Sequence, residues 1–158
     1  MFTRSGRAAL GDRGGIGRGP GRLAGLDVEA EVLAHGAWHR RLRDTIQGES
    51  REPLDVGTVS SPEGCALGQW LAGAGRQSSG ERPAFAALGQ AHQAFHTEAG
   101  AVLAHVQAGE RLKAQRRLLT TFAQRSAELV AALDELCRSP EPAGSPTAPA
   151  LVWDDFTG

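Results

Sequence analysis

The sequence predicts an all-α protein, a four-helix bundle of three long helices and one short helix that carries a cysteine. Three runs of apolar residues recur at every third or fourth position, which is typical of helices that bury one face. No run of alternating β-branched residues competes with this pattern. The 158 residues, of which 41% are apolar and 22% charged, suffice for one domain with its own core.

The first long helix is expected to start after Asp27 and to end near Gly48. Aspartate is a favoured N-cap residue, and glycine is common where a helix stops. The apolar stripe of this helix contains, at spacings of four and three, Val28, Val32, His35, His39, Leu42 and Ile46.

A turn-rich stretch follows, with Pro53, Gly57 and Pro62, and after it comes the segment that starts at Cys65. This segment is long enough for one short helix, which we expect Gly73 and Gly75 to stop.

Two more long helices complete the predicted bundle. Proline is suited to the first turn of a helix, so the second long helix is expected to begin at Pro83. Its stripe contains Phe85, Leu88, His92, Phe95, Ala99, Val102 and Val106. The stripe of the third contains Leu112, Leu119, Phe122, Leu129, Leu133 and Leu136.

The two ends differ from this core, which spans residues 26–138. Residues 1–25 contain eight glycines and five arginines, and such a composition is expected to be disordered. Residues 139–158 form a proline-rich tether. The whole chain has a net charge of −1, which predicts neither nucleic-acid binding nor attraction to an anionic membrane.

The cellular location is expected to be the cytoplasm. Two cysteines are too few for a disulfide framework and instead indicate reduced thiols or metal ligands. No apolar stretch is long enough to insert into a membrane, and the N-terminus has no apolar secretory signal.

Ligand-type residues recur along the predicted bundle. His35 lies on the first stripe, Cys65 opens the short helix, and His92 and His96 lie one turn apart on one helix face. Three neutral imidazoles and one thiolate would complete a tetrahedral zinc shell. His39 is on the same stripe as His35, so geometry alone does not choose between them. Taken singly, a buried histidine is more often a core residue with one hydrogen bond, and a chance HxxxH pair is common.

The ligand-type residues belong to three motifs, His35-x-x-Trp38, then Cys65-Ala-Leu-Gly68-Gln-Trp70, then His92-x-x-x-His96, separated by 26 and 21 residues. This arrangement resembles the chemoreceptor zinc-binding (CZB) domain of bacteria, over essentially the whole stretch from Leu26 to Leu136. The resemblance implies a four-helix bundle with one zinc ion held by His35, Cys65, His92 and His96. It also implies that Trp38 and Trp70 pack around the site, and that Gly68 lets the short helix approach closely.

The other histidines and the second cysteine are expected outside the ligand set. The family pattern selects His35, which leaves His39 as a partly exposed neighbour and a candidate hydrogen-bond donor to a ligand. His105 is expected to point elsewhere, and Cys137 to be a buried, inert thiol.

A regulatory role follows from the resemblance, because family members are modules of chemoreceptors and diguanylate cyclases that respond to zinc or oxidants, and they tend to be homodimers. We expect a zinc-binding sensory module of chemotaxis-linked signalling that responds to zinc availability or to oxidation of the Cys65 thiolate by oxidants such as hypochlorous acid. A four-ligand shell leaves no open metal position, so no enzymatic activity is expected. The alternatives are a cytoplasmic zinc buffer and a structural-zinc adaptor. The length suggests a stand-alone domain that acts on a partner in trans.

The end of the tether offers a clue to that partner. The segment from Val152 to Phe156, with Trp153 as its other aromatic residue, resembles the xWxxF pentapeptide that ends some bacterial chemoreceptors. That pentapeptide recruits the adaptation methyltransferase or methylesterase, although the second acid, Asp155, departs slightly from the common pattern. The alternative is that this end packs on its own bundle or has no role.

Overall fold

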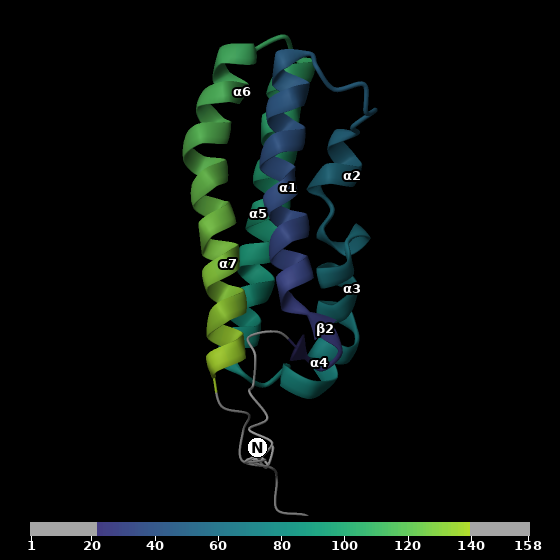
Figure 1. Ribbon diagram of the computed structural model, residues 1–158, viewed down its shortest axis with the longest axis vertical. Helices are drawn as coiled ribbons and strands as arrows, with labels where there is room; N and C mark the ends of the chain where they lie inside the picture. Colours follow the sequence, from purple (N-terminus) through teal and green to yellow (C-terminus); the bar gives the residue numbers. More distant parts are fainter. Residues whose placement is uncertain (1–21, 140–158) are drawn as a thin grey trace, which may run out of the picture.

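The structure is a computed structural model that describes residues 22–139, and there it confirms the all-α class (Figure 1). Three long helical columns run side by side. They consist of α1 (Val28–Gln47), then α5 (Pro83–Gln107), then the continuous run of α6 (Arg111–Arg117), the π turn η2 (Leu118–Phe122) and α7 (Ala123–Arg138). No helix within residues 22–139 is long and apolar enough to cross a membrane.

The fourth position is filled by several short helices instead of one. They lie along one side of α1 and α5 (Figure 1) and are α2 (Val56–Ser60), the 3₁₀ turn η1 (Pro62–Gly64), α3 (Ala66–Ala72) and α4 (Ala74–Ser79). Gly73 ends α3, as predicted. The prediction that Gly75 also stops a helix is wrong, because this residue lies inside α4. Its backbone packs so closely on Trp70 that a Cβ atom there would lie 2.5 Å from the indole ring.

The predicted ends of the long helices are confirmed where capping chemistry was visible in the sequence. The Asp27 carboxylate accepts a hydrogen bond from the Ala30 amide at 3.0 Å, which caps α1. Gly48 closes the same helix with a φ of 77°, a conformation that glycine adopts readily. Pro83 is the first residue of α5.

The predicted stripe of the third column is wrong over its first half. Leu112 and Leu119 are 82% and 62% exposed, whereas Ala114, Leu118 and Phe122 are buried. These three buried residues are spaced by four, and positions four apart gradually rotate away from a single face of an ordinary α-helix, which has 3.6 residues per turn. The wider π turn that begins at Leu118 absorbs this drift, so Phe122 still faces the core.

The core centres on α5, which packs against α1, α2, α6 and α7. In its middle, the rings of Phe95 and Phe122 lie 5.1 Å apart between centroids. The Phe95 ring also contacts His35 edge-on at 5.1 Å. An aromatic layer thus lies directly beside the predicted ligands and shields them from water on the α5–α7 side.

A small antiparallel hairpin, which the sequence did not indicate, precedes α1. Strand β1 (Arg22–Leu23) pairs with β2 (Leu26–Asp27). The Trp70 indole N–H donates to the Ala24 carbonyl at 3.3 Å, which connects this hairpin to α3. Residues 22–25, part of the segment expected to be disordered, therefore form a hairpin; residues 1–21 and 140–158 lie outside the described range.

Candidate metal centre

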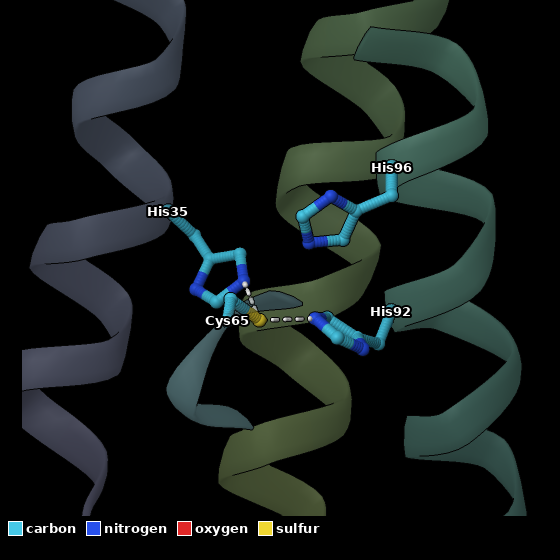
Figure 2. Close-up of side chains that lie close together, drawn as sticks. All are labelled: His35, Cys65, His92 and His96. Atoms are coloured by element: carbon cyan, nitrogen blue, oxygen red, sulfur yellow. Dashed lines mark hydrogen bonds between the residues drawn. The ribbon is translucent and has the colours of Figure 1, made fainter. Parts of the chain in front are cut away.

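The four predicted ligands come together at one place in the bundle (Figure 2). One nitrogen or sulfur atom from each of His35, Cys65, His92 and His96 lies within 4.8 Å of the others. His35 comes from the middle of α1, the cysteine precedes α3, and the other two histidines occupy successive turns of α5. Three segments far apart in the sequence thus contribute to one cluster.

The sulfur atom lies between imidazoles from the two long helices. Cys65 Sγ is 3.1 Å from His92 Nε2 and 3.9 Å from His35 Nε2 (Figure 2). The His92 and His96 rings lie edge to face, with their centroids 4.7 Å apart. The ligand atoms therefore converge on a small volume instead of stacking past one another.

Backbone carbonyls fix the orientation of two imidazoles. His35 Nδ1 donates to the Glu31 carbonyl at 2.8 Å, and His96 Nδ1 donates to the Val59 carbonyl at 2.9 Å. A carbonyl oxygen only accepts hydrogen bonds, so both Nδ1 atoms carry the hydrogen. In the neutral rings, both Nε2 atoms consequently present a lone pair, as metal ligation requires.

Burial keeps the imidazoles neutral. It lowers the pKa of all three histidines, and together with the neighbouring His96 and His35 it lowers the pKa of His92 to about 3. Burial also raises the pKa of the Cys65 thiol, although the Gly68 amide donates to its sulfur at 3.4 Å. The histidines are thus ready to ligate at neutral pH, while the thiol needs a cation nearby to lose its proton.

The donor set fits Zn²⁺. His96 Nε2 is buried and has no hydrogen-bond partner within residues 22–139, which is an unfavourable state for a buried polar atom. A metal ion at the centre of the cluster would satisfy it. Three imidazole nitrogens and one sulfur are the ligands that zinc takes in closed tetrahedral sites. We therefore regard zinc as the ion for which this cluster is suited.

A buried carboxylate, which the sequence did not reveal, lies next to the cluster. Glu31 is only 8% exposed, and its Oε2 is 3.8 Å from His35 Nδ1. Burial raises the pKa of this carboxyl, while a hydrogen bond from the Leu67 amide opposes the shift. Glu29 is the other acid in the first turn of α1, and nothing in the sequence distinguishes Glu31 from it.

The predicted packing residues have different positions. Trp38 is half-buried on the outer side of the cluster, where the Arg41 guanidinium lies 3.7 Å from the centre of its ring. At Gly68, a Cβ atom would lie 1.8 Å from the Pro62 carbonyl oxygen, so only glycine permits this approach of η1 and α3. Trp70 is buried against Phe85 and the hairpin.

The remaining candidates lie outside the cluster. His39 faces Phe122, with the ring centroids 6.4 Å apart, and it is not one of the four residues of the cluster. His105 pairs with Glu110 at 2.6 Å. Cys137 is half-buried near the end of α7, rather than fully buried as expected. Trp153 and Phe156 lie outside the described residues.

Comparison with known proteins agrees with the geometry. Residues 35–103 match the family model described as chemoreceptor zinc-binding domain. The match begins at the first predicted ligand and includes the other three. No curated protein and no solved structure matches the chain.

Proposed function

We propose, because residues 35–103 match the chemoreceptor zinc-binding domain, that His35, Cys65, His92 and His96 hold one Zn²⁺ and that the protein senses a chemical signal through this centre. Domains of this family are regulatory, zinc-binding and associated with chemotaxis, and they are not a known class of enzyme. The role we assign is that of a signalling module in the bacterial cytoplasm.

The observation that carries this proposal is the origin of the ligands in three separate segments. Zinc, when bound, supplies a cross-link among α1, α5 and the residue before α3, and it favours the thiolate form of Cys65. The Glu31 and Val59 carbonyls hold the His35 and His96 imidazoles in the ligating tautomer. Loss of the Cys65 ligand therefore removes the cross-link between the segment before α3 and the two long helices.

Two signals act on such a centre. The first is zinc availability, because the cross-link between the residue before α3 and the two long helices exists only when the metal is bound. The second is oxidation of Cys65. The thiolate and hypochlorous acid yield a sulfenic acid and chloride, so sulfur loses two electrons and chlorine gains them. The sulfenic acid is a poorer ligand than the thiolate, and its formation weakens the attachment of η1 and α3.

Metal analysis tests the proposal. The purified chain is expected to contain one zinc per molecule, and Cys65→Ser is expected to lose it, whereas the control Cys137→Ser keeps it. Stoichiometric hypochlorous acid is expected to release zinc from the parent protein. Full occupancy in the Cys65→Ser protein would contradict the ligand assignment. Zinc release without a change in helical content would favour a buffer over a sensor.

We also propose a homodimer that uses the outer face of α1, α6 and η2. Leu112 and Leu119 are exposed on this face and line a groove of about 460 Å³ together with His39 and Ile46. Apolar grooves with exposed leucines are typical of protein contacts. The dimer is expected to dissociate in the variant with Leu112→Ser and Leu119→Ser, as measured by sedimentation. A parent chain that sediments as a monomer would rule the dimer out.

An adaptor role through the tether is the second candidate, and it depends on the sequence from Val152 to Phe156. Two aromatic anchors separated by acids are suited to a shallow site on a chemotaxis methyltransferase or methylesterase. A peptide of the last residues is expected to bind one of these enzymes and to lose binding when Trp153 is replaced by alanine. A peptide that binds neither enzyme would remove this role.

A further inference from the structure

A surface pocket of about 270 Å³ leads from solvent to the ligand cluster. Trp38 and Arg41 of α1 form one side, and Glu52 with the following loop forms the other. Cys65 and His96 line its inner end. The pocket is thus a path along which a small solute reaches the sulfur without displacing a long helix.

Three side chains are linked where the pocket meets solvent. Arg41 donates to both carboxylate oxygens of Glu52, with an Nε–Oε2 distance of 3.1 Å, while its guanidinium stacks on Trp38. The side chains of the ion pair are 35% and 44% exposed, whereas His96 is only 3% exposed. The pair therefore lies at the outer end of the pocket and the ligands at the inner end.

We propose that the Arg41–Glu52 pair, stacked on Trp38, is a gate that limits which solutes reach Cys65 Sγ and how fast. Exposed ion pairs are weak and open transiently, so such a gate slows entry without sealing the pocket. The effect of the gate on zinc entry and exit rests on the function proposed above. Its effect on the rate at which reagents modify the Cys65 thiol is independent of that function.

The charges along the pocket favour small uncharged solutes. Arg41 and Glu52 compensate each other, which leaves the Asp55 carboxylate as the unbalanced charge among the lining residues. Asp55 already accepts hydrogen bonds from the amide and hydroxyl of Thr58 and so stays in place. Neutral molecules such as hypochlorous acid or a haloacetamide are therefore preferred over anions of similar size.

Alkylation of the zinc-free full chain tests the gate. With iodoacetamide, the Cys65 thiolate forms a bond from sulfur to carbon and iodide leaves. Peptide mass spectrometry follows this reaction and, in the same molecules, that of Cys137 as an internal reporter of general unfolding. Arg41→Ala and Glu52→Gln are each expected to speed alkylation of Cys65 about three- to tenfold, since either change breaks the pair. The rate at Cys137 is expected to stay constant.

Arg40→Ala is the matched control, because Arg40 is the exposed neighbour of Arg41 and does not line the pocket. Iodoacetate, the anionic reagent, separates gating from simple electrostatics. A gate predicts that Arg41→Ala and Glu52→Gln both speed its reaction. A purely electrostatic effect predicts opposite changes, and that result would overturn the proposal. The proposal would also be overturned if Cys65 in Arg41→Ala and Glu52→Gln were alkylated at rates within about twofold of the rate in the Arg40→Ala control.

Zinc exchange gives an independent readout. A gate changes the rates of entry and exit by the same factor, so both are expected to rise in Arg41→Ala while the equilibrium Kd stays constant. A changed Kd with a constant entry rate would overturn the gate and make Arg41 a support for the ligands. A parent chain that binds no zinc would overturn the proposed function, and the alkylation rates would still decide the gate.

Discussion

The Val59 carbonyl accepts a hydrogen bond from His96 Nδ1 at 2.9 Å, so the last turn of α2 positions a predicted zinc ligand of α5. The two helices are close because α5 has a glycine at this level. A Cβ atom at Gly100 would lie 1.8 Å from Ser60 Oγ. The short helices are thus part of the metal centre even where they contribute no ligand.

Gly100→Ala is expected to separate α2 from α5 and to lower the free energy of unfolding by about 1–3 kcal/mol, the usual cost of overpacking. Urea denaturation of the zinc-free protein measures it. Gly89→Ala is the control on the same helix, because nothing lies within 4 Å of a Cβ atom there. That control is expected to be slightly stabilising, since alanine favours helix over glycine. Equal effects of the two substitutions would contradict the close packing.

Gly68→Ala is expected to impair zinc binding more than folding. The added methyl group would overlap the Pro62 carbonyl oxygen and displace η1 from α3, between which Cys65 lies. We expect zinc affinity to fall by at least about tenfold, the effect typical of residues that position a ligand. Competition with a chelator measures it. Gly64→Ala, for which there is open space, is expected to keep the parent affinity.

Glu31→Gln is expected to have effects of opposite sign on the two forms of the protein. In the zinc-bound form, loss of the negative charge 3.8 Å from His35 Nδ1 is expected to lower zinc affinity by about tenfold. In the zinc-free form, an uncharged amide avoids burying a carboxylate, so stability is expected to be constant or higher. Glu29→Gln, at an exposed position, is the control because it changes the net charge by the same amount. Weaker folding of zinc-free Glu31→Gln would contradict this account.

The zinc-free protein is expected to lose stability as the pH falls below about 6.5. The pKa of each buried histidine in the cluster is lowered in the folded state, that of His92 to about 3, so the unfolded chain binds more protons in this range. Each group contributes a loss of up to about 1.4 kcal/mol per pH unit. Urea midpoints between pH 7.5 and 4.5 measure it. The variant His92→Gln is expected to show a shallower decline with pH than the parent protein.

The sequence predicted those parts of the fold and site that depend on local chemistry. The Asp27 cap, the Gly48 stop and the start at Pro83 each follow from the conformational preference of a single residue. The ligand cluster followed from spacing, because residues four apart on a helix share a face and the intervening lengths matched a known pattern.

The missed features depend on the backbone or on distant contacts. The Val59 carbonyl is a main-chain group that any residue would supply, so no sequence signal marks it. The π turn at Leu118 changes which leucines face inward, and for that reason Leu112 and Leu119 are exposed although the sequence predicts them on the buried stripe. The sequence predicts that Gly75 stops a helix, whereas close packing against the Trp70 ring explains why a glycine is present there.

Helix α3 places Cys65 and Trp70 only five residues apart, one just before its first turn and the other in its second. The indole holds the Ala24 carbonyl of the hairpin that precedes α1. Helix α3 therefore connects the metal centre, at its N-terminal end, to the hairpin that precedes α1. A displacement of the sulfur is therefore expected to reach the hairpin, which lies at the end of the bundle opposite the loop between α5 and α6 (Figure 1).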